Sequence, residues 1–251
     1  MNSQTAQILC ELNTRFYAEQ CESFASTREH PWHGWQNLDV LGELCAGEAP
    51  VFSVFDLACG NLRFESFLAS EFPAATITFY AVDNCDALVP QAPAVRYQSL
   101  DVLAALQEGP KLNERYNAPL CDLSVCFGFM HHVPLATWRE RILLSLVRQT
   151  RPGGYVVVAL WQFLSNTALA AKAQVTHERA RAELSLPPLE SGDYLLGWKD
   201  TPGVYRYCHS FSEPEIDHLA AVVADRATVL SRFASDGRTD NLNTYLVLRV
   251  H

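Results

Sequence analysis

Short apolar runs alternate with segments of helical pattern from Val51 onward. The apolar runs read VFSVFDLA, ITFYAVD, VRYQSLD, LCDLSVCFGF and GGYVVVALW. Between them, the sequence predicts helices at 62–71, 101–107 and 134–150. The last of these has helical apolar spacing and is ended by Arg151-Pro152-Gly153-Gly154. Alternation of this kind predicts a doubly wound, mostly parallel β-sheet with helices on both faces.

The chain on either side of this core also carries regular patterns. Residues 3–45 predict two helices joined by the loop TREHPWHGW, and residues 163–186 predict a helix that interrupts the strand pattern. A strand at RYCHSF, a helix from about residue 213 and two strands near 227–233 and 243–250 follow. We therefore expect one α/β domain over residues 1–251 with a seven-stranded sheet. Its parts are an N-terminal helical cap (1–48), a cofactor-binding core (50–162), a substrate-side insertion after strand five (163–212), and a closing helix and strands (213–251).

Composition and charge limit the function. Hydrophobic residues make up 49% of the 251 residues and charged residues 19%, which rules out a disordered or fibrous chain. Residues 1–138 hold 6 Lys/Arg and 16 Asp/Glu, whereas residues 139–251 hold 13 and 12. A nonspecific nucleic-acid binder needs clustered cations to neutralise phosphates. Any nucleic-acid role must therefore be local, or must use the charge of a partner.

Cysteines and apolar segments bear on the compartment. The eight cysteines are scattered and form no CxxC pair, so we expect reduced, buried thiols, a cytoplasmic protein and no metal site. The first residues lack a basic region followed by an apolar stretch, so we expect no signal peptide. The uncharged segment from Gly153 to Ala171 contains the polar residues Gln162 and Ser165, so its run of apolar residues is too short to span a membrane. The length of that apolar run predicts a buried strand.

The segment FDLACGNLRFE predicts a ligand site. It places Asp56 at the end of a buried strand, then a turn of small residues, then a helix. Ala58 and Gly60 let a ligand approach the backbone, and the start of a helix favours polar or anionic groups. The spacing is not GxGxxG and no GKS/T follows, which weakens the dinucleotide and P-loop interpretations.

Two further acids follow successive strands. Asp83 ends the second strand, where a carboxylate can accept both hydroxyls of a ribose. Asp101 and Val102 end the third, where the acid suits an exocyclic amine and the valine packs on an adenine ring. A single Asp after a strand is commonly a helix cap. Three acids in register at three strand ends favour a nucleoside-containing cofactor.

With these residues, the sequence resembles the class I S-adenosylmethionine-dependent methyltransferases over roughly 50–162 and the closing strands. The glycine-rich turn of that family reads Ala-Cys-Gly-Asn-Leu here and keeps only Gly60. The resemblance implies a Rossmann-like methyltransferase fold and S-adenosylmethionine as the cofactor. The cofactor-binding residues it implies are Arg28, Asp56, Ala58, Cys59, Gly60, Asn61, Asp83, Asn84, Asp101, Val102, Phe127, Gly128 and His132.

Three other segments resemble the eukaryotic tRNA wobble-uridine carboxymethyl methyltransferases, which esterify a carboxymethyl group on the base. They are FASTREHPW (24–32), FMHHVPLATWRERILLSLVRQTRPGGYVVVALW (129–161) and RYCHSFSEPEI (206–216). Asp240-Asn241 before the last strand is also similar. The resemblance implies a tRNA acceptor and a small zinc-binding activator subunit as partners.

A carboxylate acceptor dictates the chemistry of the site. It is already ionised at neutral pH, so it needs positioning rather than a base. Arg grips two carboxylate oxygens at once. We expect Arg28, Arg206 and His209 on the cap segments and His131 or His132 on the floor to act as catalytic residues. An amine or hydroxyl acceptor would instead require His131 or His132 as a base.

Several alternatives stay open. Trp32, Trp35 and Trp161 fit core or pocket-wall aromatics, the His pair fits a loop satisfied by backbone groups, and the arginines of 139–151 fit a solvated helix face rather than an RNA track. The acidic first half also suits a methyltransferase for a small-molecule carboxylate or other metabolite. A catalytically silent partner subunit is a third interpretation. A nicotinamide enzyme is disfavoured by the glycine spacing.

Overall fold

Seven strands form the central sheet of the protein, seen in a computed structural model that describes residues 1–27, 30–90, 92, 94–109, 111–199 and 201–251. The strands are β1 (Val51–Leu57), β2 (Thr76–Asp83), β3 (Val95–Ser99), β4 (Cys121–Cys126), β5 (Thr150–Trp161), β8 (Ala227–Ser235) and β9 (Asn243–Val250). Their order is β3-β2-β1-β4-β5-β9-β8. The first five are parallel, and β9 runs antiparallel to both neighbours. The predicted doubly wound fold class is confirmed.

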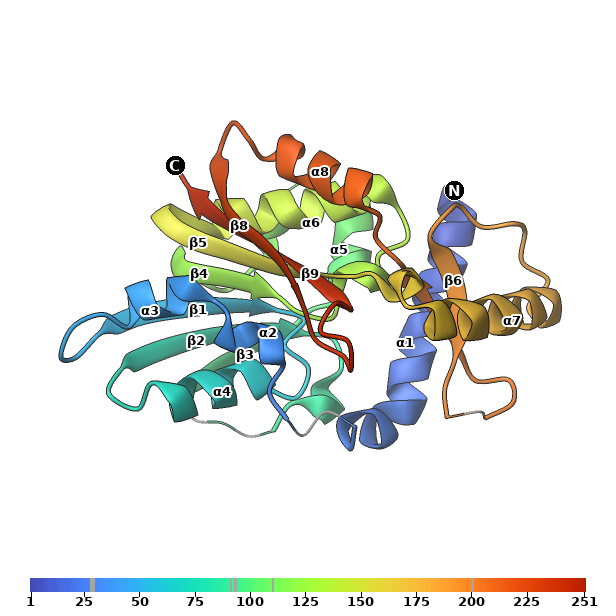
Figure 1. The fold of residues 1–251 in the computed structure, drawn as a ribbon, viewed down its shortest axis with the longest axis horizontal. Helices are drawn as coiled ribbons and strands as arrows, with labels where there is room; N and C mark the ends of the chain where they lie inside the picture. Colours follow the sequence, from blue (N-terminus) through green and yellow to red (C-terminus); the bar gives the residue numbers. More distant parts are fainter. Residues whose placement is uncertain (28–29, 91, 93, 110, 200) are drawn as a thin grey trace.

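Helices cover both faces of this sheet (Figure 1). On one face lie α2 (His33–Gln36), α3 (Asp39–Leu44) and α4 (Arg63–Glu71), and on the other lie α5 (Val102–Glu108), α6 (Ala136–Gln149) and α8 (Glu213–Val222). The alternation of side chains in β5 explains the two layers. Tyr155 and Val157 belong to the first core, and Val156 and Val158 to the second.

The remaining elements gather at one end of the sheet (Figure 1). They are α1 (Ser3–Ala25), α7 (Thr167–Glu183) and a two-stranded sheet of β6 (Asp193–Gly197) and β7 (Tyr205–His209). Leu9 and Leu12 of α1 pack with Leu195 and Tyr207 of the small sheet in a separate apolar cluster. Within the residues that the structure describes, four 3-10 turns complete the fold, at Asp86–Leu88, Leu112–Arg115, Met130–His132 and Phe163–Ser165.

Three details differ from the sequence prediction. Residues 3–45 form three helices rather than two, because the second segment divides at Asn37 and Leu38. The strand β6 was not expected, since only Leu195 at its centre is a fully buried apolar residue. The helix before β5 ends at Gln149 as predicted, but residues 151–154 continue as strand with a register shift against β4.

Two surface expectations were also tested. Arg139, expected on a solvated helix face, is buried with its guanidinium carbon 5.5 Å from the ring centroid of Phe211. Among the described residues, no helix combines the length and the apolar character that a membrane crossing requires.

Candidate active site

A cavity of about 910 Å³ opens at the carboxyl ends of the parallel strands, beneath α1. Ligand sites of doubly wound folds lie at this edge of the sheet, where the connections diverge. Ten of the residues predicted to form the site line this cavity. They are Ala58, Asp83, Asn84, Asp101, Val102, Phe127, Gly128, His131, His132 and Arg206.

The turn after β1 brings backbone to the cavity wall. Ala58, Gly60 and Leu62 have φ angles of 62°, 55° and 57°, so the turn alternates through the left-handed region. Asp83 secures it, because Oδ2 accepts the Gly60 N–H at 2.8 Å and Oδ1 accepts the Cys85 N–H at 2.9 Å. Burial raises the pKa of Asp83, and these backbone donors oppose that rise. A carboxylate offers about four lone-pair sites, so Asp83 can still accept ribose hydroxyls.

The position of Asp101 is compatible with both interpretations offered by the sequence. Its Oδ1 accepts the Ala104 N–H at 2.9 Å and so caps α5. The same residue lines the cavity beside Val102, and its Oδ2 takes no hydrogen bond from the described part of the chain. A helix cap and a site for an exocyclic amine are therefore compatible in one carboxylate. Together with Asp83, this pair of acceptors fits the ribose hydroxyls and the exocyclic amine of the adenosine of S-adenosylmethionine.

Four residues of the predicted cofactor set do not line the cavity within the described structure: Asp56, Cys59, Gly60 and Asn61. Asp56 lies behind the turn, 3% exposed, against the equally buried Glu65 of α4. Burial raises the pKa of Asp56 well above its usual range and that of Glu65 to about 7. We infer that the two carboxyls share a proton, so Asp56 supports the turn instead of contacting a ligand. Glu65 was not singled out from the sequence; the only signal was an acid between Phe64 and Phe67 on a helix.

Arg206 sits in an aromatic cage at the other end of the cavity. Its guanidinium carbon is 5.4 Å from the ring centroids of Phe16 and Trp198, and 5.9 Å from those of Phe24 and Trp161. The residue is 8% exposed and lines the cavity. Its buried Nε has no hydrogen-bond partner among the described residues. A buried guanidinium with an unused donor is suited to bind an anion.

A hydrogen-bond chain joins Arg206 to His132. The guanidinium donates to Tyr17 on α1, and the Tyr17 hydroxyl is 2.7 Å from His132 Nε2. His132 Nδ1 lies 2.9 Å from the carbonyl oxygen of Tyr207, which can only accept. Asn13 Nδ2, which can only donate, is farther from Nδ1 at 3.2 Å and donates to the same carbonyl. The shorter contact therefore assigns the proton to Nδ1, and Nε2 accepts from the tyrosine. The imidazole of His132 is committed to holding the cap, which favours a positioning role over a base.

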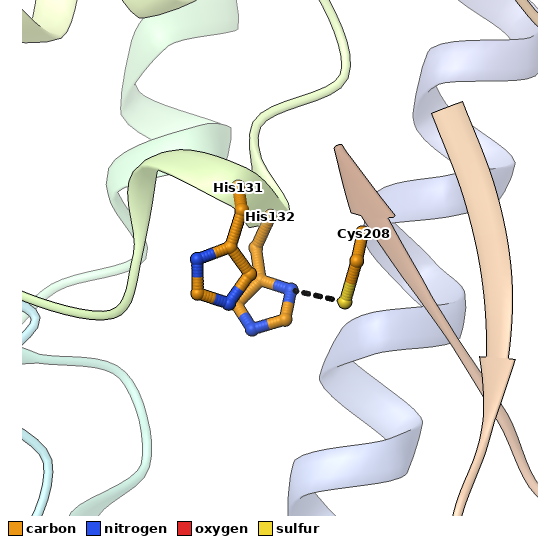
Figure 2. A group of neighbouring side chains, drawn as sticks. All are labelled: His131, His132 and Cys208. Atoms are coloured by element: carbon orange, nitrogen blue, oxygen red, sulfur yellow. Dashed lines mark hydrogen bonds between the residues drawn. The ribbon is translucent and has the colours of Figure 1, made fainter. Parts of the chain in front are cut away.

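His131 and His132, which line the cavity, lie beside the fully buried Cys208 of β7 (Figure 2). Their candidate ligand atoms fall within 4.8 Å of one another, close enough to suggest a metal site. However, both nitrogens of His132 are engaged as described, and burial raises the pKa of the Cys208 thiol to about 11. A metal ligand must be a thiolate and an unprotonated imidazole nitrogen. Hydrogen bonds to Tyr17, Tyr207 and Cys208 thus account for the position of His132 in this cluster.

His209 is placed elsewhere, in correction of the sequence expectation. It is 1% exposed and does not line the described cavity. Its Nδ1 is 2.8 Å from Asp193 and its Nε2 is 2.9 Å from Glu215, so it bridges β6 to the start of α8. Hydrogen bonding to His209 and to the Ser212 backbone overcomes the effect of burial and lowers the pKa of Glu215 to about 2. Arg28, the remaining predicted residue, lies outside the described residues.

The sequence did not single out three polar residues of this cavity, namely Asn13, Tyr17 and Asn243. Asn13 and Tyr17 lie on α1, where the sequence pattern predicted a helix but indicated no functional residue. Asn243 begins β9 and reads as an ordinary strand residue. The available signal for Asn13 was a polar residue on the apolar face of its helix.

Comparison with known proteins agrees with this architecture. No family model matches the chain. A tRNA (carboxymethyluridine(34)-5-O)-methyltransferase of Arabidopsis thaliana is 24% identical over 147 residues, which cover 59% of this chain and 32% of that protein. A putative methyltransferase of Encephalitozoon cuniculi is 26% identical over 197 residues, covering 78% and 79%. The chain thus spans about a third of the Arabidopsis relative and most of the Encephalitozoon one.

Solved structures share the fold. The DhpI–SAM–HEP complex superposes with a TM-score of 0.58 at 16% identity, over 96% of this chain and 97% of the other. A SAM-dependent methyltransferase of Methanosarcina mazei gives 0.57 at 15% identity, over 84% and 96%. The resemblance stated from the sequence is confirmed. Relatives named as methyltransferases and a shared methyltransferase fold agree with the predicted enzyme class and with S-adenosylmethionine as its cofactor.

Proposed function

We propose that this protein transfers a methyl group to a carboxylate held by Arg206 and so forms a methyl ester. The proposed carboxylate is the carboxymethyl group of a tRNA wobble uridine. The observation that carries the proposal is the caged guanidinium of Arg206, which lines the same cavity as Asp83 and Asp101. The Arabidopsis relative, named for this acceptor, supports the choice of substrate. S-adenosylmethionine supplies, when bound, a methyl group on a positively charged sulfur.

The chemistry requires little from the protein beyond positioning. One carboxylate oxygen forms a bond to the methyl carbon as the bond from that carbon to sulfur breaks, and both charges disappear. No proton moves, because a carboxylate with a pKa near 4 is already ionised. Arg206 holds the acceptor in line, while Phe24 and Trp161 exclude water from the guanidinium. Since charge is lost, overly tight binding of the ionic reactants would oppose turnover.

A tRNA acceptor must bind where the charge permits it. The near-neutral half of the chain includes α7, which carries Lys172, Arg179 and Arg181, and the β6–β7 hairpin, whose Arg206 lines the cavity. We include in the proposal that RNA lies over this helix and that a small activator subunit supplies further contacts. All eight cysteines lie within the described residues and are unpaired thiols, which supports a reducing, cytoplasmic setting.

The test is methyl transfer from labelled cofactor into an RNA stem-loop carrying 5-carboxymethyluridine at the wobble position. We expect label in the RNA that is lost under mild base, as an ester requires. Arg206→Lys should reduce transfer at least tenfold with cofactor affinity unchanged, because lysine cannot grip two oxygens. Arg139→Lys is the matched control, since Arg139 is also buried but contacts Phe211 away from the cavity. Equal loss in both variants, or no label in RNA, would overturn the proposal.

A second acceptor class is favoured by the acidic residues at the cavity. Glu11 and Glu108 line it together with Asp83 and Asp101, which disfavours a polyanion nearby. A small-molecule carboxylate would avoid that repulsion and use the same arginine. Transfer into the small-molecule fraction of a cell extract, with none into RNA, would select this alternative.

A further inference from the structure

The β8–β9 end of the cavity contains a carboxylate saturated with donors. Asp236 Oδ1 accepts the Gly34 N–H at 2.9 Å, and its Oδ2 accepts the Tyr245 hydroxyl at 2.7 Å and Asn243 Nδ2 at 2.8 Å. A carboxylate accepts and does not donate, so the amide of Asn243 must turn its NH₂ group to Asp236. The orientation of this amide is therefore fixed by the protein.

The other atom of that amide is left for a ligand. Asn243 is 7% exposed and lines the cavity. Its Oδ1 accepts no hydrogen bond within the described part of the chain, yet it is not among the fully buried atoms without a partner. The oxygen is thus open to the cavity. The wall presents one acceptor of fixed direction.

This acceptor lies beside the anion-binding cage. Trp161 of β5 stands directly opposite Asn243 of β9 in the antiparallel ladder, so the two side chains leave the same face about 5 Å apart at Cβ. The Trp161 ring is also 5.9 Å from the guanidinium carbon of Arg206, and Trp161, Asn243 and Arg206 all line the cavity. One indole is therefore a neighbour both of a group suited to bind a carboxylate and of a group that can accept an N–H.

We propose that Asn243 Oδ1 accepts a hydrogen bond from a ring N–H of the methyl acceptor and thereby selects the heterocycle. The acceptor is then a planar ring with an imide-type N–H and a short side chain ending in a carboxylate, which packs against Trp161. A ring with a lone pair at that position places it against the Asn243 oxygen and is rejected. This inference rests on the proposed function and adds the determinant of ring identity.

The test compares two RNA stem-loops that differ only in this group, one with 5-carboxymethyluridine and one with 5-carboxymethylcytidine. The uridine ring carries N–H at position 3, and the cytidine ring carries a lone pair there. We expect the protein to methylate the uridine stem-loop at least 30-fold better in kcat/KM. Asn243→Ala should reduce that ratio to below about 3-fold, chiefly by slowing transfer to the uridine.

Tyr245→Phe is the matched control, because it removes another donor from Asp236 but leaves Asn243 Oδ1 in place. It should keep the 30-fold ratio, and its loss of stability calibrates that of Asn243→Ala. Equal transfer to both stem-loops by the unmodified protein, or an unchanged ratio in Asn243→Ala, would overturn this inference alone. Transfer to neither stem-loop would overturn the proposed function and this inference with it.

Discussion

Asn13 and Tyr207, 194 residues apart, form a two-way clamp between α1 and β7. Asn13 Oδ1 accepts the Tyr207 N–H at 2.7 Å, and Asn13 Nδ2 donates to the Tyr207 carbonyl at 3.1 Å. Both residues are buried. The Asn13 amide thus bonds both backbone groups of Tyr207, as a residue of a neighbouring strand would. It thereby fixes the backbone next to Arg206.

Asn13→Leu should lower both stability and transfer. It removes the hydrogen bonds that Asn13 makes to the buried N–H and carbonyl groups of Tyr207. Their loss should lower the free energy of unfolding by about 2 kcal/mol. Because Arg206 precedes Tyr207, kcat/KM for a carboxylate acceptor should fall at least tenfold while the affinity for S-adenosylmethionine holds. Denaturant unfolding and cofactor titration measure the two effects. Glu19→Ala, an exposed change on the same helix, should alter neither. Full activity in Asn13→Leu would contradict the assigned role.

Tyr17→Phe tests the link between Arg206 and His132. The change removes the hydroxyl that lies 2.7 Å from His132 Nε2 and accepts from Arg206, but it keeps the ring packing. One such hydrogen bond contributes about 1 kcal/mol, so kcat should fall roughly fivefold to tenfold. Steady-state kinetics with saturating cofactor would measure it, with Tyr205→Phe, whose hydroxyl binds Glu183 away from the cavity, as the control. An unchanged kcat in Tyr17→Phe would show that the chain of hydrogen bonds does not position Arg206.

The dependence of the rate on pH separates a carboxylate acceptor from an amine or hydroxyl. A carboxylate stays ionised above its pKa near 4, and His132 is already committed to Tyr17 and Tyr207, so the rate should be flat from about pH 6 to 9. The measurement is kcat against pH on a single acceptor. A rise centred near the ordinary histidine pKa of about 6.5 would instead support a histidine base.

The sequence predicted the sheet and the strand-end acids Asp83 and Asp101 that line the cavity, because strand-end acids and apolar runs are local signals. Arg206 was singled out through the resemblance, and its place among four aromatic rings depends on the packing of distant segments. The contacts of Asn13 and Asn243 depend on residues far away in the chain, which no spacing rule reports. His209 was misplaced for a related reason. A histidine in RYCHSF reads alike whether it faces a ligand or two carboxylates, and only the packing of β6 and α8 decides.

His209→Gln tests that correction. The imidazole connects Asp193 to Glu215 in a buried position, so its loss should lower the free energy of unfolding by about 2 kcal/mol or more. The protein that remains folded should keep its kcat/KM within about twofold. Both quantities can be measured at low temperature, where the variant is folded. His218→Gln, an exposed histidine paired with Glu140, serves as the control and should change neither. A large loss of kcat in folded His209→Gln would contradict this correction and support a role for His209 in binding the methyl acceptor.

The carboxyl pair behind the cofactor turn predicts a particular pH dependence of stability. Burial raises the folded-state pKa of Glu65 to about 7, above its value of 4.5 in the unfolded chain, and burial also raises the pKa of Asp56 well above its usual range. A folded state that holds a proton more tightly is favoured at low pH, so this contribution is present below pH 4.5 and is lost as the pH rises towards 7. Glu65→Gln keeps a neutral partner for Asp56 and should remove the contribution of Glu65 to that loss. Between pH 5.5 and pH 8, the free energy of unfolding of the variant should therefore fall less than that of the unmodified protein, by on the order of 1 kcal/mol. Thermal unfolding across this range measures it, with the exposed Glu71→Gln on the same helix as the control. A stability profile of Glu65→Gln parallel to that of the unmodified protein would show that the pair does not share a proton.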